Sequence, residues 1–294
     1  MSPTPSDRKP SDRKPAGSQP AGRAKAETFR RLHQPGTPLL MPNPWDAGSA
    51  WLLTGLGFAA LGTTSAGLAH SLGLPDGVDR LTREIVLANA RAIVEATDLP
   101  VSGDLESCYA STPEGIAETI EAAAAAGLVG GSIEDTTGDP AEPILPVEVA
   151  VDRVSAAVQA AADLGTDFVL TARADNFLYG KADLADTIDR LQRYAAAGAA
   201  VLYAPALPDL AAVREVCRSV DRPVNVLAGP KFTVAELAEA GAGRISLGSA
   251  LSRLTLGVLR RAAQEILDDG TFGFSESAIP YGEANTLMAQ RAQS

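Results

Sequence analysis

Short apolar runs alternate with helix-forming stretches eight times along this chain, and this alternation limits its possible folds more than any other feature. Each run stops at a polar, charged or turn-forming residue, and alanine-rich stretches with helical spacing separate the runs. The runs are Pro38–Trp45, Phe58–Thr64, Leu99–Gly103, Leu128–Ile133, Phe168–Ala172, Ala199–Pro205, Pro223–Ala228 and Arg244–Gly248. A strand and a helix repeated eight times is the pattern of a (β/α)8 barrel, or TIM barrel. The sequence therefore predicts an α/β protein with one barrel domain.

Local signals support several of the predicted helices. Thr112 followed by Pro113 is typical of a helix N-cap and its first turn. Thr233 and Glu236 have the spacing of a capping box, and Asp183 is placed to cap the helix that follows it. Because these local signals agree with the global alternation, the number of elements is the firmest part of the prediction.

The two ends of the chain differ from the repeating part. Residues 1–24 contain the tandem repeat Ser6–Pro10 and Ser11–Pro15 and almost nothing apolar, which predicts a disordered tail. The barrel domain is expected over residues 25–275, with a short helix over Ala26–Leu32 that covers the bottom of the barrel. Residues 276–294 form a C-terminal extension that is too apolar for a loose tail, so it should pack on the barrel or on a neighbouring subunit.

Composition excludes several classes of partner. A net charge of −11 and the absence of a basic stripe argue against nucleic acid. The two cysteines, Cys108 and Cys217, are too few for a disulfide framework or a zinc cluster, which favours a reducing compartment. No apolar run approaches the roughly 20 residues that cross a bilayer, and the N-terminus lacks the apolar core of a signal peptide. We therefore expect a cytoplasmic protein.

Carboxylates follow the third and fourth runs, where a barrel places its active site. Asp104 and Glu106 are two residues apart, so on a strand they point the same way, and Glu134 ends the adjacent run. Oxygen ligands of this kind suit Mg²⁺ or Mn²⁺. Acids on a solvated surface strand would show the same pattern, but the position in the barrel favours a metal site at Asp104, Glu106 and Glu134. Asp135 should point to the opposite side and be structural.

Arg173 ends the fifth run, where a guanidinium can bind a carboxylate or phosphonate in two-pronged fashion. The alternative is a salt bridge to Asp175 or to a neighbouring barrel acid.

Small residues at Thr64, Ser65 and Ala66 end the second run and let backbone N–H groups approach an oxyanion closely. Asp76 lies in the loop that follows and has the reach to contact the water shell of a metal, although Pro75, Asp76 and Gly77 alone would be an ordinary turn.

Taken together and in order, six segments resemble the isocitrate lyase and phosphoenolpyruvate mutase superfamily over about residues 27–275. The segments are Thr64–Ala66, Leu72–Asp76, Asp104–Glu106 with Tyr109, Ser132–Asp135, Ala172–Asp175 and Arg244–Ser249. The resemblance implies a barrel whose last helix is exchanged between the subunits of a homodimer or homotetramer.

The resemblance also implies an enzyme and a set of roles. Mg²⁺ would lie beside Asp104, with Glu106, Glu134 and Asp76 binding it directly or through water. Backbone groups of Ser65 and Ala66, together with Arg173, would hold a small 2-oxo acid and stabilise its enolate. Such a site serves carbon–carbon lyases, mutases that move phosphorus between carbon and oxygen, and hydrolases of 2-oxo acids.

The sequence departs from these relatives in the loop and lid residues that distinguish one reaction type from another. Isocitrate and methylisocitrate lyases carry a Lys-Lys-Cys-Gly-His loop after the fourth strand, whereas residues 136–143 contain no Cys, Lys or His. The lysine and asparagine of the phosphoenolpyruvate mutase lid are missing too. Cys108 stands in place of a glycine, either as a reactive group or, more commonly, as a buried unreactive thiol. A carbon–carbon lyase is the leading interpretation, a phosphonomutase or 2-oxo acid hydrolase is the second, and a non-catalytic anion-binding barrel is the third.

Overall fold

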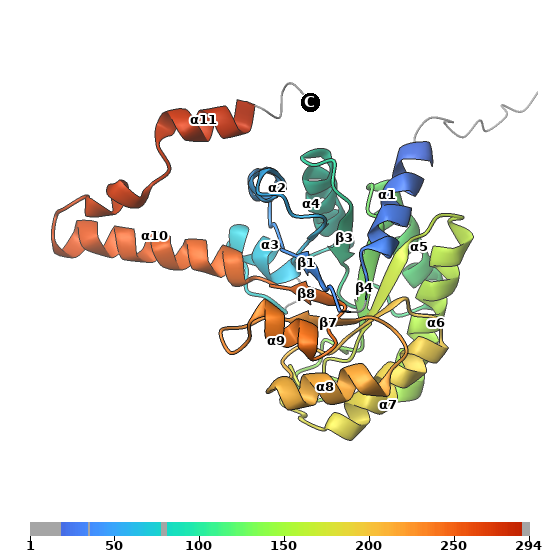
Figure 1. The fold of residues 1–294 in the computed structure, drawn as a ribbon. Helices are drawn as coiled ribbons and strands as arrows, with labels where there is room; N and C mark the ends of the chain where they lie inside the picture. Colours follow the sequence, from blue (N-terminus) through green and yellow to red (C-terminus); the bar gives the residue numbers. More distant parts are fainter. Residues whose placement is uncertain (1–18, 35, 78–80, 290–294) are drawn as a thin grey trace, which may run out of the picture.

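The computed structural model describes residues 19–34, 36–77 and 81–289, and its centre is a ring of eight parallel strands (Figure 1). The sheet order is β1-β8-β7-β6-β5-β4-β3-β2. Strands β2 to β8 therefore pair in the order of the sequence, and β1 pairs with the last strand, β8. The strands are β1 Leu39–Met41, β2 Leu61–Gly62, β3 Val101–Asp104, β4 Gly130–Glu134, β5 Val169–Arg173, β6 Val201–Tyr203, β7 Val224–Leu227 and β8 Arg244–Ser246. A 3.0 Å hydrogen bond from the Gly62 N–H to the Pro42 carbonyl joins the two edge strands. The predicted (β/α)8 barrel is confirmed, and each predicted run overlaps one strand.

Helices surround the strands and connect them. They are α1 Gln19–Arg31, α2 Ala47–Gly55, α3 Ser65–Ser71, α4 Arg83–Glu95, α5 Pro113–Ala125, α6 Val147–Asp163, α7 Leu184–Ala196, α8 Leu210–Ser219, α9 Val234–Glu239, α10 Ala250–Asp268 and α11 Tyr281–Ala289, with a short 3-10 helix at Gly273–Ser277. The predicted caps are confirmed: Thr112, Asp183 and Thr233 accept hydrogen bonds from the first turns of α5, α7 and α9. Among these helices, none has both the length and the apolar character needed to cross a membrane.

The main core lies between the strands and the helices, and a smaller cluster closes the N-terminal end of the barrel. There Ala26 and Phe29 of α1 pack with Val169 and Val201, so the first helix covers the bottom as predicted. This helix begins at Gln19 and not at Ala26, which makes residues 19–24 helical although they were expected in the tail. The rest of that expected tail, residues 1–18, lies outside the described residues.

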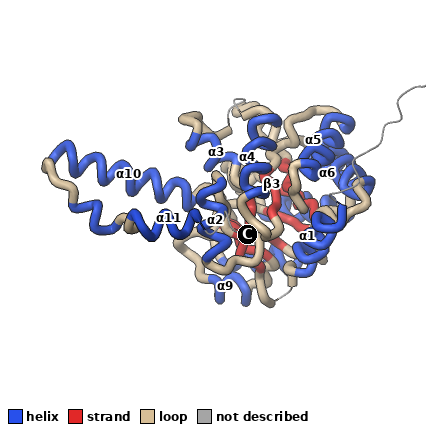
Figure 2. Tube along the Cα trace, turned by 90° about the horizontal axis from the view of Figure 1, so that it is seen from above, coloured by secondary structure: helices blue, strands red, loops and turns tan. Residues whose placement is uncertain are grey.

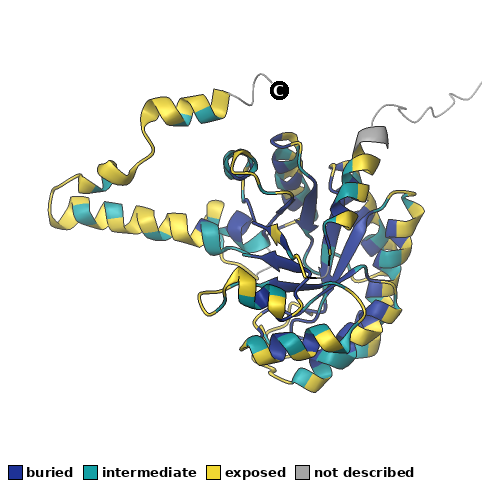
Figure 3. Cartoon of the chain, in the orientation of Figure 1, coloured by how far each residue is buried: buried dark blue, intermediate teal, exposed yellow. Residues whose placement is uncertain are grey.

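The last long helix does not close over the barrel. Helix α10 runs outward from β8, and the chain returns through α11, which forms an arm beside the barrel (Figures 1 and 2). The arm is mostly exposed, and it carries apolar side chains such as Leu259, Leu267 and Phe272, which are 65%, 79% and 64% exposed (Figure 3). Its end meets α2, where the Trp51 indole N–H donates to the Leu287 carbonyl. The described part of the C-terminal extension therefore contacts the barrel through α2.

Candidate active site

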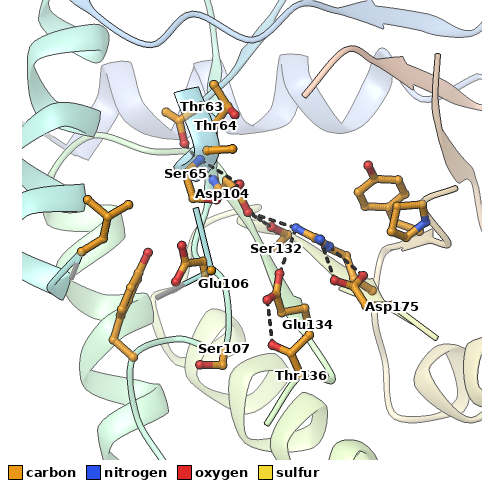
Figure 4. Close-up of a pocket in the computed structure, with 18 of the residues that line it drawn as sticks. Thr63, Thr64, Ser65, Asp104, Glu106, Ser107, Ser132, Glu134, Thr136 and Asp175 are labelled. Carbon is orange, nitrogen blue, oxygen red and sulfur yellow. Dashed lines mark hydrogen bonds and ion pairs between the residues drawn. The ribbon is translucent and has the colours of Figure 1, made fainter. Parts of the chain in front are cut away.

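Charged side chains from three adjacent strands converge at the C-terminal rim of the barrel (Figure 4). Asp104, Glu134 and Arg173 are the last residues of β3, β4 and β5. The strand registers pair Glu134 with Arg173 and place Asp104 beside Ser132, two residues before Glu134. They line a cavity of about 1010 Å³ that Thr64, Ser65, Ala66, Asp76 and Glu106 also line. The structure thus gathers every site residue predicted from the sequence around one cavity.

Arg173 lies at the centre of this cluster and pairs with three carboxylates. Its Nη1 lies 3.2 Å from Asp104 and 3.0 Å from Glu134, while Nη2 and Nε contact the two oxygens of Asp175 at 2.7 and 3.1 Å. The Arg173 guanidinium also lies 5.2 Å from the centre of the Tyr203 ring, within cation–π range. The salt bridges considered in the sequence analysis are therefore present, and the substrate-binding role of Arg173 stays a prediction.

The start of α3 orients Asp104. The backbone N–H and the hydroxyl of Ser65 both donate to Asp104 Oδ2, at 3.0 and 2.9 Å. Thr64 is the N-cap of α3 and accepts a hydrogen bond from the Gly67 N–H at 3.2 Å. The Ser65 N–H, expected to face a substrate oxyanion, thus donates to a carboxylate in this structure, although Ser65 and Ala66 both line the cavity.

The cluster holds more negative charge than Arg173 can balance. Burial, together with the charges of Asp104 and Asp76, raises the pKa of Glu106 to about 7. Burial raises the pKa of Glu134 to about 8 even though Arg173 opposes the shift. Arg173 itself stays charged, because Asp175, Glu134 and Asp104 outweigh its burial and raise its pKa. Crowded carboxylates of this kind favour the arrival of another cation.

The donor set fits a hard divalent cation, because Asp76, Asp104, Glu106 and Glu134 offer only carboxylate oxygens. Within the described ranges, however, no three His, Cys, Asp or Glu side chains are already arranged as a metal-binding group. Mg²⁺ is often held by one or two carboxylates and several waters, so a preformed set of three ligands is not required. The assignment of Asp104, Glu106 and Glu134 as metal ligands stays a prediction.

The loop after β3 is held in an unusual backbone conformation. Glu106, Cys108 and Tyr109 have φ values of 48°, 58° and 51°, in the left-handed region that favours glycine. Arg153 of α6 supports the loop by donating to the Ser107 and Ala110 carbonyls at 2.6 and 2.8 Å. Cys108 is fully buried, and burial raises the pKa of its thiol to about 12. The burial predicted for Cys108 is confirmed, and its lack of reactivity stays a prediction.

Asp135 points away from the cavity, as the alternation along β4 predicts. It accepts hydrogen bonds from the Asp175 N–H at 2.8 Å, Arg190 at 3.1 Å and the Tyr194 hydroxyl at 2.8 Å. Through Asp175 this buried network positions Arg173. Sequence reasoning missed Arg190 and Tyr194, because α7 reaches Asp135 only in the folded chain.

The turn after β4 is short and closes on itself. Thr136 forms an antiparallel bridge with Ile144, and the Thr137 N–H donates to the Pro143 carbonyl at 2.9 Å. The Thr136 hydroxyl also donates to Glu134 at 2.7 Å, a contact that the sequence did not indicate. This turn contains none of the Lys, Cys and His residues of the methylisocitrate lyase loop.

The C-terminal rim of the strands, where this charged cavity lies, is where enzymes built on (β/α)8 barrels have their active sites. The chain belongs to the isocitrate lyase and phosphoenolpyruvate mutase superfamily, since the family described as phosphoenolpyruvate phosphomutase matches residues 29–267. The resemblance seen in the six segments is confirmed. Members of this superfamily are lyases or mutases of small carboxylic acids.

Individual relatives cover most of the chain. Protein Rv1998c of Mycobacterium tuberculosis strain H37Rv, whose function is uncharacterised, is 34% identical over 262 residues, covering 89% of this chain and 96% of the relative. The 2-methylisocitrate lyase of Escherichia coli K12 is 34% identical over 232 residues, covering 71% and 76%. A crystal structure of a proposed lyase/mutase from Burkholderia cenocepacia J2315 superposes with a TM-score of 0.88 at 47% identity, covering 92% and 97%.

Proposed function

We propose that this protein is a Mg²⁺-dependent enzyme that acts on a small 2-oxo or 2-hydroxy carboxylic acid through an enolate, as a carbon–carbon lyase. The observation that carries the proposal is the convergence of Asp104, Glu134 and Arg173 at one cavity. Kinship with 2-methylisocitrate lyase supports the choice of a lyase. Mn²⁺ would serve in place of Mg²⁺, since both prefer oxygen ligands.

In this proposal the chain supplies orientation and charge. Asp104, Glu106 and Glu134 would hold Mg²⁺, directly or through water, and the ion would supply Lewis-acid stabilisation of developing negative charge. Arg173 would grip the substrate carboxylate, and the small residues Thr64, Ser65 and Ala66 let the acid approach the backbone at the start of α3.

Asp76 would contribute from the loop after α3. Burial and the charge of Asp104 raise the pKa of Asp76, so this carboxyl is better able to hold a proton at the cavity than an exposed aspartate. We propose that it assists catalysis in this way or by binding the water shell of the ion.

The turn after β4 lacks the cysteine of the methylisocitrate lyase loop, so reactions other than carbon–carbon cleavage stay candidates. Without a cysteine there, a phosphonomutase or a 2-oxo acid hydrolase is the second candidate, and a non-catalytic anion-binding barrel is the third. The enzyme candidates differ in their products, and the non-catalytic barrel forms none, so product assays combined with a binding measurement separate them.

We expect purified protein with Mg²⁺ to release pyruvate or glyoxylate from one member of a panel of 2-hydroxy and 2-oxo diacids. Coupled assays for both products, run beside an Asp104→Ala variant and an EDTA-treated sample, should show turnover only in the untreated wild type. Movement of phosphorus between carbon and oxygen in a phosphonate would instead support the mutase, and cleavage of a 2-oxo diacid by water, without pyruvate or glyoxylate as a product, would support the hydrolase. Tight oxalate binding without turnover of any 2-oxo acid would support the non-catalytic barrel.

We further propose that the arm of α10 and α11 packs on a second copy of the chain, which gives a homodimer or homotetramer. The exposed leucines of the arm support this, because apolar surface of that extent is usually covered. Light scattering should give a dimer or tetramer mass, and Leu259→Asp should lower it. Val149→Asp, on the exposed face of α6, is the matched control and should leave the mass unchanged. A monomeric wild type would contradict the proposal.

A reducing, cytoplasmic setting fits the two cysteines, which are both free.

A further inference from the structure

The hydroxyl of Tyr109 is a buried polar group that has no hydrogen-bond partner in the described part of the chain. Tyr109 belongs to the loop after β3 and lines the cavity together with Asp104 and Glu106. It packs against an apolar cluster that includes Leu68 and Leu81. A buried hydroxyl without a hydrogen bond has lost its hydration without compensation, and most buried polar groups therefore have a partner. This exception points to a ligand in the cavity as the missing partner.

The backbone that carries Tyr109 is strained, and two helices hold it in place. Glu106, Cys108 and Tyr109 all have φ values in the left-handed region. The Thr119 hydroxyl of α5 donates to the Cys108 carbonyl at 2.7 Å, and Arg153 of α6 donates to two other carbonyls of the loop. Strained backbone persists only where surrounding contacts enforce it, and it is concentrated at functional sites. The contacts from α5 and α6 therefore fix the position from which the Tyr109 side chain reaches the cavity.

The Tyr109 hydroxyl lies within reach of the charges of three carboxylates. Burial and the charges of Glu106, Asp104 and Glu134 raise the pKa of Tyr109, so the hydroxyl stays protonated and neutral at physiological pH. The same three carboxylates are the proposed ligands of the divalent ion, and none of them accepts a hydrogen bond from Tyr109. A protonated phenol keeps oxygen lone pairs that accept hydrogen bonds. Tyr109 therefore offers an uncharged acceptor beside the proposed ion site.

We propose that Tyr109 is a positioning residue for the divalent ion, and that its hydroxyl oxygen accepts a hydrogen bond from a water molecule in the hydration shell of that ion. This inference rests on the proposed function and adds one residue to its ion site. Mg²⁺ keeps several waters when few carboxylates bind it. The hydrogen atoms of these waters point away from the ion and need acceptors, and the Tyr109 oxygen supplies one without adding charge to a cavity already rich in acids.

Tyr109→Phe tests the proposal, because it removes the hydroxyl and keeps the ring that packs on the apolar cluster. Titration calorimetry with Mn²⁺, without any substrate, should show an affinity about tenfold lower than that of the wild type, the lower end of the effect of such outer contacts on metal sites. The melting temperature of the EDTA-treated variant should be unchanged or higher, because no hydrogen bond within the protein is lost. The rise in melting temperature that Mn²⁺ causes should be smaller than in the wild type.

Tyr203→Phe is the matched control, because it makes the same change at another tyrosine of the cavity lining. Tyr203 lies on β6, and its ring centre is 5.2 Å from the Arg173 guanidinium. Phenylalanine keeps a ring over Arg173, so the Mn²⁺ affinity of this variant should stay close to that of the wild type. An equal loss of affinity in both variants would overturn the assignment to Tyr109, because removal of any hydroxyl from the cavity would then have the same effect.

The outcomes separate this inference from the proposed function. Absence of Mn²⁺ binding in the wild type would contradict the proposed function itself. Normal Mn²⁺ binding by the wild type, with the same affinity in Tyr109→Phe, would overturn only the role of Tyr109, and a loss confined to oxalate affinity would show that the hydroxyl contacts the substrate and not the water of the ion. A lower melting temperature of the EDTA-treated variant would also overturn the proposal, because the hydroxyl would then have a partner within the protein.

Discussion

Replacing Asp104 with alanine should abolish the binding of one Mn²⁺ or Mg²⁺ per subunit. Asp104 is the carboxylate that the Ser65 N–H and hydroxyl orient, and it faces Glu134 and Glu106 across the cavity. Removing one carboxylate from a small set of oxygen ligands leaves too few charged donors to replace the hydration shell of the ion. Titration calorimetry with Mn²⁺ would measure the affinity directly.

An Asp46→Ala variant is a suitable control for this experiment. Asp46 is also an aspartate beside the end of a strand, but its side chain caps α2 by accepting from the Ser49 N–H at 2.7 Å. We expect this variant to bind Mn²⁺ like the wild type. Unchanged Mn²⁺ affinity in Asp104→Ala would contradict the metal assignment, and tight zinc binding would argue against an all-oxygen site.

The pH dependence of metal binding offers an independent measurement. Because burial and neighbouring acids raise the pKa of Glu106 to about 7, protons compete with the ion for this carboxylate near neutral pH. Mn²⁺ affinity of the wild type should therefore fall as the pH drops below about 7. In Glu106→Gln the affinity should be lower overall and should change less over the same range.

The barrel could be predicted from the sequence because its signal is repeated and local. Each strand of a parallel barrel is buried on both faces, so it reads as an apolar run that stops at the rim. Asp104, Glu134 and Arg173 were predicted to meet for the same reason: each ends its own strand, and neighbouring strands end at the same rim. Prediction of the convergence required only the order of the strands.

Contacts between side chains on distant elements could not be predicted in this way. Nothing in the spacing shows that Arg190 and Tyr194 of α7 hold Asp135, or that Arg244 extends across the barrel to Thr171. The start of α1 was also misplaced, because residues 19–22, Gln-Pro-Ala-Gly, show no apolar periodicity and resemble the composition of the tail before them. A helix that is anchored only by its later residues, Ala26 and Phe29, carries no such periodicity where it begins.

Arg173→Lys should weaken Mg²⁺-dependent oxalate binding by about 1.5–3 kcal/mol, the scale of hydrogen bonds to charged groups. Lysine keeps the positive charge near Asp104 and Glu134 but lacks the planar fork that binds a carboxylate with two parallel hydrogen bonds. Oxalate resembles a planar enolate, so calorimetry with this ligand tests the anion site without depending on the unknown substrate. Mn²⁺ affinity, measured on the same protein, should remain close to that of the wild type.

If Arg173 has only a structural role, its salt bridges predict a different result for Arg173→Lys, namely a loss of stability instead of a loss of oxalate affinity. Its two-pronged contact with Asp175 would then be the interaction that lysine loses, and the variant would melt at a lower temperature. Oxalate affinity of the folded variant would stay at the wild-type value. Arg193→Lys, on the exposed face of α7, controls for a general effect of the substitution, because Arg193 pairs with Asp189 and Glu148 far from the cavity lining. Unchanged oxalate affinity in both variants would remove Arg173 from the anion site and leave a metal-binding barrel whose substrate contacts lie elsewhere.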